Sequence, residues 1–208
     1  MPQPQAVIFD IGNVLIEWNP ERFYDSVIGP EARARLFAEV PLTEMNLEID
    51  RGALFRETVY AMAEAHPRWA DPIRLWHDRW IDIASPRIEH SIALLRALRA
   101  KGVPVFTLTN FGVHSFAYAQ TQYDFLNEFD RLYVSGHMNA LKPEARIYQM
   151  VEKDCGLDPA TLLFTDDKPE NVEAAAARGW QVHLFDGAAP WAQRLVAAGL
   201  LTETEARP

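Results

Sequence analysis

Short apolar runs alternate with helical stretches over most of this chain, and that alternation is what most limits the folds open to it. After Ser85 and Pro86, each apolar run is followed by residues with apolar side chains at helical spacing. Because parallel strands need crossover connections, such alternation predicts an α/β fold, a Rossmann-like parallel sheet wrapped by helices. The predicted strands are 6–9, 103–109, 132–135, 161–165 and 180–185, and the predicted helices of this part are 88–100, 144–153 and 171–178.

The segment between the first strand and the rest of the sheet has a different pattern. Amphipathic stretches follow one another there without an intervening strand, separated by glycine and proline residues. They are 21–28, 30–40, 52–66 and 70–83. Successive helices of this kind predict a small bundle. We therefore expect an α/β domain made of residues 1–16 and 87–208, with a helical domain, residues 17–86, inserted after the first strand.

Composition excludes several classes of protein. Hydrophobic residues make up 49% and charged residues 24% of the chain, as in a globular protein. The formal net charge of −9 argues against general nucleic-acid binding, and no apolar run approaches membrane-spanning length. The single cysteine, Cys155, allows no internal disulfide, and the N-terminal residues lack the pattern of a signal peptide. We expect a cytoplasmic protein without nucleic-acid or membrane partners, and the sequence leaves its oligomeric state open.

Polar side chains stand where three of the predicted strands end. Asp10 follows the first strand, Thr109 and Asn110 the second, and Asp166 and Asp167 the fourth. The carboxyl ends of parallel strands share one edge of a sheet, so these groups should converge, with Lys142 reaching the same edge from the loop after the third strand. Each of these residues also has a purely structural explanation. The aspartates could form turns or helix caps. Thr109 could make a hydrogen bond at the end of its strand, and Lys142 could be solvated.

Asp10, Asp166 and Asp167 would bring three negative charges close together. Two like charges about 4 Å apart cost about 4 kcal/mol at an effective dielectric of 20, so the cluster needs protonation or cations. Mg²⁺ prefers one or two carboxylates, waters and a substrate phosphate. With Lys142 as a further cation, and with Thr109 and Asn110 donating to phosphate oxygens, the pattern predicts a Mg²⁺-assisted site for a phosphorylated small molecule.

These residues resemble the motifs of the haloacid dehalogenase-like (HAD) hydrolase superfamily. FDIGNVL is similar to the first motif, LTN to the second, LKPEARIY to the third and FTDDKPENVEAAAARG to the acidic fourth. The order and spacing of all four resemble the family over nearly the whole chain. Within it, GNV and KPEARIY most resemble small bacterial sugar-phosphate phosphatases of the α-D-glucose-1-phosphate phosphatase type.

The resemblance implies a role for each matched residue. Asp10 would be the nucleophile, with Thr109 and Lys142 completing the catalytic group, and the inserted bundle would be a cap that closes over the site. The implied metal ligands are Asp10, the Gly12 carbonyl and Asp167, with Asp166 either reaching Mg²⁺ through water or orienting Lys142. The implied substrate-binding residues are Gly12, Asn13, Thr109, Asn110 and Lys142. The expected activity is hydrolysis of a small, sugar-phosphate-like ester through an aspartyl-phosphate.

Gly12 is the one departure from the family pattern. Phosphatases of this family usually carry there a second aspartate, which acts as general acid and then as base, a contribution of about 10²- to 10⁴-fold in rate. Three explanations stay open: a leaving group that needs little help, a proton carried by a cap residue or a water, or chemistry other than phosphoryl transfer.

Two other functions remain as alternatives. A metal-independent dehalogenase would attack carbon with Asp10 and would need no acid, but Asp166 and Asp167 would then repel its substrate. A non-catalytic binding module is supported only by Gly12. Substrate choice depends on which cap side chains face the site, and the candidates are Glu17, Trp18, Arg22, Asn46, Glu48, Arg51 and Trp80, with His114 the one histidine near a motif.

Overall fold

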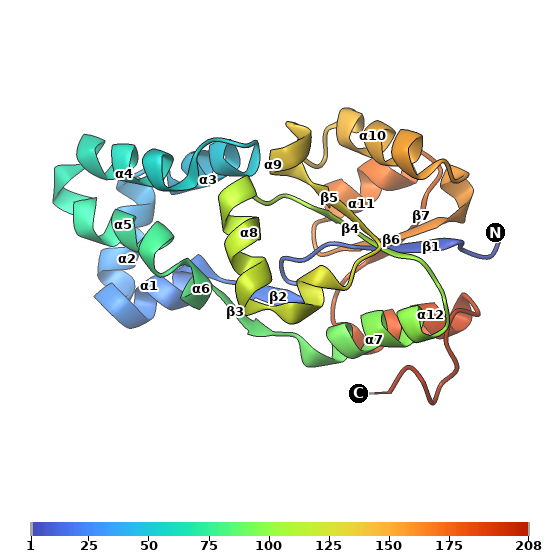
Figure 1. Cartoon of the computed structure of the whole chain (residues 1–208). Helices are drawn as coiled ribbons and strands as arrows, with labels where there is room; N and C mark the ends of the chain where they lie inside the picture. The colour runs from blue at the N-terminus through green and yellow to red at the C-terminus, as the bar shows by residue number, and fades with distance from the viewer. Residues whose placement is uncertain (1, 208) are drawn as a thin grey trace.

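The central sheet has five parallel strands in the order β5-β4-β1-β6-β7 (Figure 1). The structure is a computed structural model and describes residues 2–207. The strands are β1 (Ala6–Phe9), β4 (Val105–Thr109), β5 (Arg131–Val134), β6 (Leu162–Asp166) and β7 (Gln181–Leu184). The predicted α/β, Rossmann-like fold is confirmed.

Strand β1 is central because each of its residues is apolar and buried on one face of the sheet or the other. Val7 and Phe9 belong to the core beneath α7 (Glu89–Ala100) and α12 (Ala188–Ala197), and the ring of Phe9 meets Trp191 edge-on at 5.6 Å. Ala6 and Ile8 belong to the opposite core, under α10 (Ala145–Cys155) and α11 (Pro169–Ala176). Figure 1 shows these two pairs of helices on opposite faces of the sheet.

Helices α1 to α6 gather beyond one end of the sheet (Figure 1). They are α1 (Pro20–Ile28), α2 (Pro30–Glu39), α3 (Leu42–Asp50), α4 (Phe55–Ala65), α5 (Ala70–Asp78) and α6 (Trp80–Ile83). They are joined to the rest by an antiparallel ribbon of β2 (Ile16–Trp18) and β3 (Ala84–Arg87). The predicted domain boundaries, 16/17 and 86/87, both fall within this ribbon, and the division into two domains stays a prediction.

Helix α3 is absent from the elements predicted by the sequence pattern. It forms because Leu42, Met45 and Ile49 recur at helical spacing and all three are buried. Two predicted helices also differ. The 70–83 stretch forms α5 and α6, since the backbone leaves the helical region at Arg79, with φ −125° and ψ 29°. The 52–66 stretch becomes helical only at Phe55, because Gly52 has φ +116°.

The remaining elements are short or lie at the edges of the core. They are α8 (Val113–Gln122), α9 (Ser135–Met138) and the 3₁₀ turns Pro67–Trp69, Asp124–Asn127 and Pro159–Thr161. Strands β2 and β3 and helix α12 were not among the predicted elements either. Within residues 2–207, none of the helices has the length and hydropathy needed to cross a bilayer.

Candidate active site

Three carboxylates and one ammonium meet at the carboxyl edge of the sheet. Asp10 follows β1, while Asp166 ends β6 and Asp167 comes next. One oxygen from each of these carboxylates lies within 4.8 Å of those of the other two. The Nζ atom of Lys142 is 2.9 Å from Asp10 Oδ1 and 2.6 Å from Asp166 Oδ2. The structure therefore brings together the charged residues that the strand-end argument predicted to converge.

Lys142 is buried, with 4% of its surface exposed, and its position is fixed from two sides. Its Nζ also donates to the carbonyl of Leu108 at 2.9 Å. Its backbone exchanges two hydrogen bonds with the side chain of Asn110: Asn110 Nδ2 donates to Lys142 O at 3.0 Å, and Lys142 N donates to Asn110 Oδ1 at 2.8 Å. The amide of Asn110 was expected to donate to a phosphate, but here its Nδ2 and Oδ1 both hold the lysine loop, which makes its backbone N–H the better placed donor for an anion.

Asp166 and Asp167 have different surroundings. Asp166 is fully buried, and both of its oxygens accept hydrogen bonds from Asn171 Nδ2 at 3.0 Å, with a further bond from Lys168 N at 2.8 Å to Oδ1. Asp167 is only partly buried and accepts from Asn13 Nδ2 at 2.9 Å. The contacts of Asp166 thus favour the second of its two predicted roles, orienting Lys142.

Asn13 links the first motif to the fourth. Its backbone has φ +56°, a left-handed conformation that asparagine tolerates better than most residues. Its Oδ1 accepts from Trp18 N at 2.9 Å while its Nδ2 reaches Asp167. Its backbone N–H donates to Ile16 O at 2.7 Å. The sequence reasoning assigned Asn13 to substrate binding through its backbone and missed this side-chain bridge, which only the turn geometry shows.

Burial and charge shift the ionisation of the central pair. Burial raises the pKa of Asp10 to about 6, against the lowering effect of Lys142, and Asp166 raises it further. Burial by itself would lower the pKa of Lys142, but Asp10 and Asp166 outweigh it and raise that pKa. Lys142 is therefore a cation at neutral pH, and positive charge added nearby would shift Asp10 further toward its ionised form.

The acidic cluster fits a divalent metal. Lys142 compensates only one of the three carboxylate charges, and Asp10 Oδ1, although 2.9 Å from Nζ, accepts no hydrogen bond from any residue in the described range 2–207. A set of carboxylate oxygens beside an open cavity is the donor chemistry that Mg²⁺ prefers, in agreement with the predicted cofactor.

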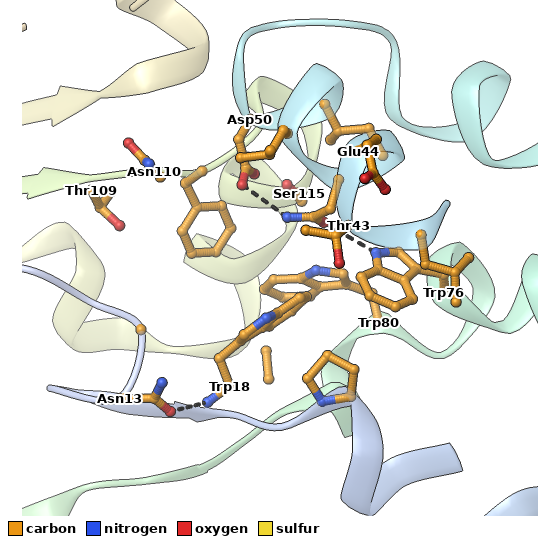
Figure 2. A pocket seen from close by; sticks show the side chains of 18 of the residues that line it. Asn13, Trp18, Thr43, Glu44, Asp50, Trp76, Trp80, Thr109, Asn110 and Ser115 are labelled. Atoms are coloured by element: carbon orange, nitrogen blue, oxygen red, sulfur yellow. Dashed lines mark hydrogen bonds between the residues drawn. The ribbon is translucent and has the colours of Figure 1, made fainter. Parts of the chain in front are cut away.

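A cavity of about 710 Å³ opens from this cluster toward helices α1 to α6. Its floor is formed by the sheet edge, including Asp10, Gly12 and Thr109, and its far wall by the inserted helices. Trp18 lies against Trp76 and Trp80 in that wall, with ring centroids 5.8 and 6.1 Å apart. Figure 2 shows the tryptophans gathered on one side, with Thr109 and Asn110 on the other.

Comparison with known proteins places this architecture in a family. A model of the haloacid dehalogenase-like hydrolases matches residues 4–179. The chain belongs to that family. The resemblance inferred from the four motifs is thereby confirmed.

Two curated relatives of this HAD-like hydrolase are phosphatases. Sesquiterpene phosphatase astK of Aspergillus oryzae is 26% identical over 202 residues, covering 89% of this chain and 92% of the fungal protein. D-ribitol-5-phosphate phosphatase of Bacteroides thetaiotaomicron is 22% identical over 200 residues, covering 91% and 95%.

Solved structures of similar shape include the HAD family enzyme bt-2542 of Bacteroides thetaiotaomicron. Its TM-score is 0.71 at 20% identity, over 93% of this chain and 99% of that one. The same enzyme was solved with magnesium and inorganic phosphate, and that structure has a TM-score of 0.65 at 19% identity, covering 88% of this chain and 95% of the other. L-2-haloacid dehalogenase of Xanthobacter autotrophicus has a TM-score of 0.61 at 19% identity, covering 98% of this chain and 86% of the dehalogenase. At these identities the likeness shows the fold.

The predicted cap-side candidates divide into two groups. Trp18, Asn46 and Trp80 line the cavity. Glu17, Arg22, Glu48, Arg51 and His114 are engaged elsewhere: Arg22 pairs with Glu17, Arg51 with Glu144 at 2.5 Å, Glu48 lines a shallower groove on α3 and α4, and His114 Nδ1 lies 3.5 Å from Phe55 N.

Asp50, the last residue of α3, lines the cavity and was not among the predicted residues. Its Oδ2 accepts from Asn46 Nδ2 at 2.8 Å, and Asn46 Oδ1 in turn accepts from Trp76 Nε1 at 3.1 Å (Figure 2). Burial raises the pKa of Asp50 to about 7. The sequence does carry a sign of this helix, because apolar residues recur at helical spacing over 42–49 and Asp50 follows directly.

Proposed function

We propose that this HAD-like hydrolase is a Mg²⁺-dependent phosphomonoesterase that works through an aspartyl-phosphate on Asp10. The observation that carries the proposal is the buried Asp10–Lys142–Asp166 arrangement beside Asp167, at the floor of the cavity. A carboxylate oxygen of Asp10 would bond to phosphorus as the ester oxygen leaves. Water would then break the Asp10–phosphorus bond and release phosphate, so that one difficult displacement becomes two.

Asp10, Asp167 and the Gly12 carbonyl would hold the metal, with Asp166 orienting Lys142. When bound, Mg²⁺ supplies positive charge that neutralises phosphate oxygens and favours the ionised form of Asp10. Lys142, the Thr109 hydroxyl and the backbone N–H groups of Gly12 and Asn110 would hold the phosphoryl group in line with Asp10. Asn13, whose N–H donates within its turn, would act by orienting Asp167.

The relatives support hydrolysis of small phosphate esters. Two of them carry the names sesquiterpene phosphatase and D-ribitol-5-phosphate phosphatase, and a structural neighbour binds magnesium with inorganic phosphate. Metal-independent attack on carbon is less well supported, because three carboxylates with a single lysine would repel an acidic organic halide in the absence of a cation.

The size and lining of the cavity favour a small metabolite as substrate. A sugar phosphate is the first candidate class, since tryptophan rings pack well against the apolar faces of sugar rings. A terpenyl phosphate is the second candidate, favoured by the three clustered indoles of Trp18, Trp76 and Trp80.

The test is phosphate release from a panel of esters, with Mg²⁺ and with EDTA. The panel contains glucose 1-phosphate, ribitol 5-phosphate, farnesyl phosphate and 4-nitrophenyl phosphate, and halide release from 2-chloropropionate is measured in parallel. We expect phosphate release that requires Mg²⁺. Halide release in EDTA, without hydrolysis of any phosphate ester, would overturn the proposal in favour of the dehalogenase alternative.

A further inference from the structure

Departure of an alkyl oxygen is assisted by a proton, and neither Gly12 nor the buried Asp10–Lys142 pair is available to supply it. Gly12 has no side chain where related phosphatases carry their acid. Lys142 is held by two carboxylates, and Asp10 is needed as nucleophile. The carboxylates on the opposite wall, which the inserted helices form, are therefore the candidates for this proton donor.

Four carboxylates of the inserted helices line the cavity, and only Asp50 among them is shielded from solvent. Glu21, Glu39 and Glu44 are exposed, and Glu39 is engaged with Trp69 Nε1 at 2.7 Å. Asp50 is partly buried, lines the same cavity as Asp10 and Lys142, and its pKa responds to the charges of Lys168, Asp10 and Lys142. Figure 2 shows it at the edge of the cavity, between Asn110 and Thr43.

The corner that carries Asp50 is attached to the α/β part of the molecule. The carbonyl of Asp50 accepts a hydrogen bond from Ser135 Oγ at 2.6 Å, and the next residue, Arg51, pairs with Glu144 at 2.5 Å. Gly52 follows with φ +116°, and a Cβ there would come within 2.9 Å of the Gly136 carbonyl. Although Asp50 belongs to the inserted helices, these contacts hold it at the rim of the sheet.

The carboxylate of Asp50 is held in a shared hydrogen-bond arrangement. Oδ2 accepts from Asn46 Nδ2 at 2.8 Å, and the backbone N–H of Gly112, which follows the second motif, lowers the pKa of the carboxyl. Burial raises its pKa to about 7, while Lys168, Gly112 and Lys142 lower it and Asp10 raises it. Such a group exchanges a proton near neutral pH, as a general acid must.

We propose that Asp50 is the general acid and base of the reaction, delivered from the inserted helices in place of the side chain that Gly12 lacks. This inference rests on the proposed function. As Asp10 bonds to phosphorus, the ester bond breaks and its oxygen takes the electron pair and the proton of Asp50. Asp50, now ionised, takes a proton from the water that attacks the aspartyl-phosphate. The Asp10–phosphorus bond then breaks, which restores both carboxyl groups and releases phosphate.

The test compares two kinds of leaving group in Asp50→Asn. In 4-nitrophenyl phosphate the phenolate leaves without a proton, whereas the alcohols of ribitol 5-phosphate and farnesyl phosphate need one. We expect kcat/KM, which reports the step that expels the alcohol or phenolate, to fall by about 10²- to 10⁴-fold on the better alkyl ester and to change by less than about threefold on the aryl ester. Because both esters share the hydrolysis of the aspartyl-phosphate, kcat should fall on both. Glu64→Gln, which neutralises an exposed carboxylate of α4 outside the cavity, is the matched control and should leave both rates unchanged.

Restoring the missing side chain provides a second readout. Gly12 lacks a positive φ, and the nearest atom to an added Cβ is Trp18 Cβ at 3.9 Å, so neither the backbone nor crowding at Cβ opposes a side chain there. The double variant Gly12→Asp/Asp50→Asn should hydrolyse the alkyl ester at least tenfold faster than Asp50→Asn alone. In the wild type, kcat on the alkyl ester should fall above about pH 7 as Asp50 loses its proton, and this limb should be absent from Asp50→Asn.

The outcomes separate this inference from the proposed function. If the wild type with Mg²⁺ hydrolyses neither type of ester, the proposed function fails. If the wild type is active and Asp50→Asn lowers kcat/KM equally on both esters, or on neither, Asp50 is not the acid. Hydrolysis of the aryl ester alone by the wild type would also overturn the inference. Asp50→Glu, which keeps the carboxyl, should retain more alkyl-ester activity than Asp50→Asn and provides a second variant if the amide does not fold.

Discussion

The two walls of the cavity are built in different ways. On the sheet side, each functional group is fixed by a strand end and by neighbours from other motifs: Lys142 by Asn110, Asp166 by Asn171, Asp167 by Asn13. On the helical side, Asp50 is fixed by a helix end and by contacts that cross between the two parts of the molecule. The comparison indicates that chemistry common to a family resides on the sheet, whereas proton delivery and substrate choice depend on the inserted helices.

The largest effect should come from the sheet side. Asp10→Asn removes the nucleophile that both ester classes need, so kcat should fall by about 10⁴-fold or more on alkyl and aryl esters alike. The loss of activity is measured by phosphate release, and the aspartyl-phosphate on Asp10 is sought by mass spectrometry of the trapped protein. Turnover close to that of the wild type would exclude Asp10 as nucleophile.

A smaller loss is expected when a supporting residue on the same wall is removed. Asn110→Ala breaks both hydrogen bonds to the Lys142 backbone, so kcat should fall by about 10- to 100-fold on both ester classes. The free energy of unfolding should drop by about 1–3 kcal/mol, because buried partners lose their hydrogen bonds. Steady-state kinetics and urea unfolding measure the two effects. Equal activity with lowered stability would limit Asn110 to a structural role.

A change in the aromatic wall should alter selectivity more than catalysis. Trp18→Ala removes the ring that contacts both Trp76 and Trp80. We expect the ratio of kcat/KM between farnesyl and ribitol phosphates to change by about tenfold, since one ring contact is worth about 0.5–1.5 kcal/mol. The rate on 4-nitrophenyl phosphate at saturation should stay nearly constant. An equal loss of kcat/KM on every ester would instead indicate that Trp18 stabilises the fold and does not select the substrate.

The smallest effect concerns stability and pH. The raised pKa of Asp50, about 7, means that the folded protein binds a proton more tightly than the unfolded chain, so this group lowers stability as pH rises from about 4 to 7. Asp50→Asn should therefore melt about 3 °C or more above the wild type at pH 8, with a much smaller difference at pH 4. Thermal melts without metal at both pH values check this. A variant less stable than the wild type at pH 8 would contradict the buried, ionisable state of Asp50.

Much of the sheet side could be predicted because it depends on local order in the chain. A strand ends, the next residues are polar, and parallel topology then places Asp10, Thr109 and Asp166 at one edge. The hydrogen-bond roles of Asn13 and Asn110 were missed, since each depends on a partner that is distant in sequence, namely Asp167 and Lys142.

The sequence by itself determined the parallel α/β fold, the acidic cluster with its lysine, and the requirement for a cation, because these follow from chain order and charge. Only the tertiary structure decided that α3 exists, that it ends on the rim of the sheet, and that Asp50 faces the same cavity as Asp10. The physical reason is that α3 is a short helix stabilised by burying Leu42, Met45 and Ile49, and packing of that kind is set by long-range contacts.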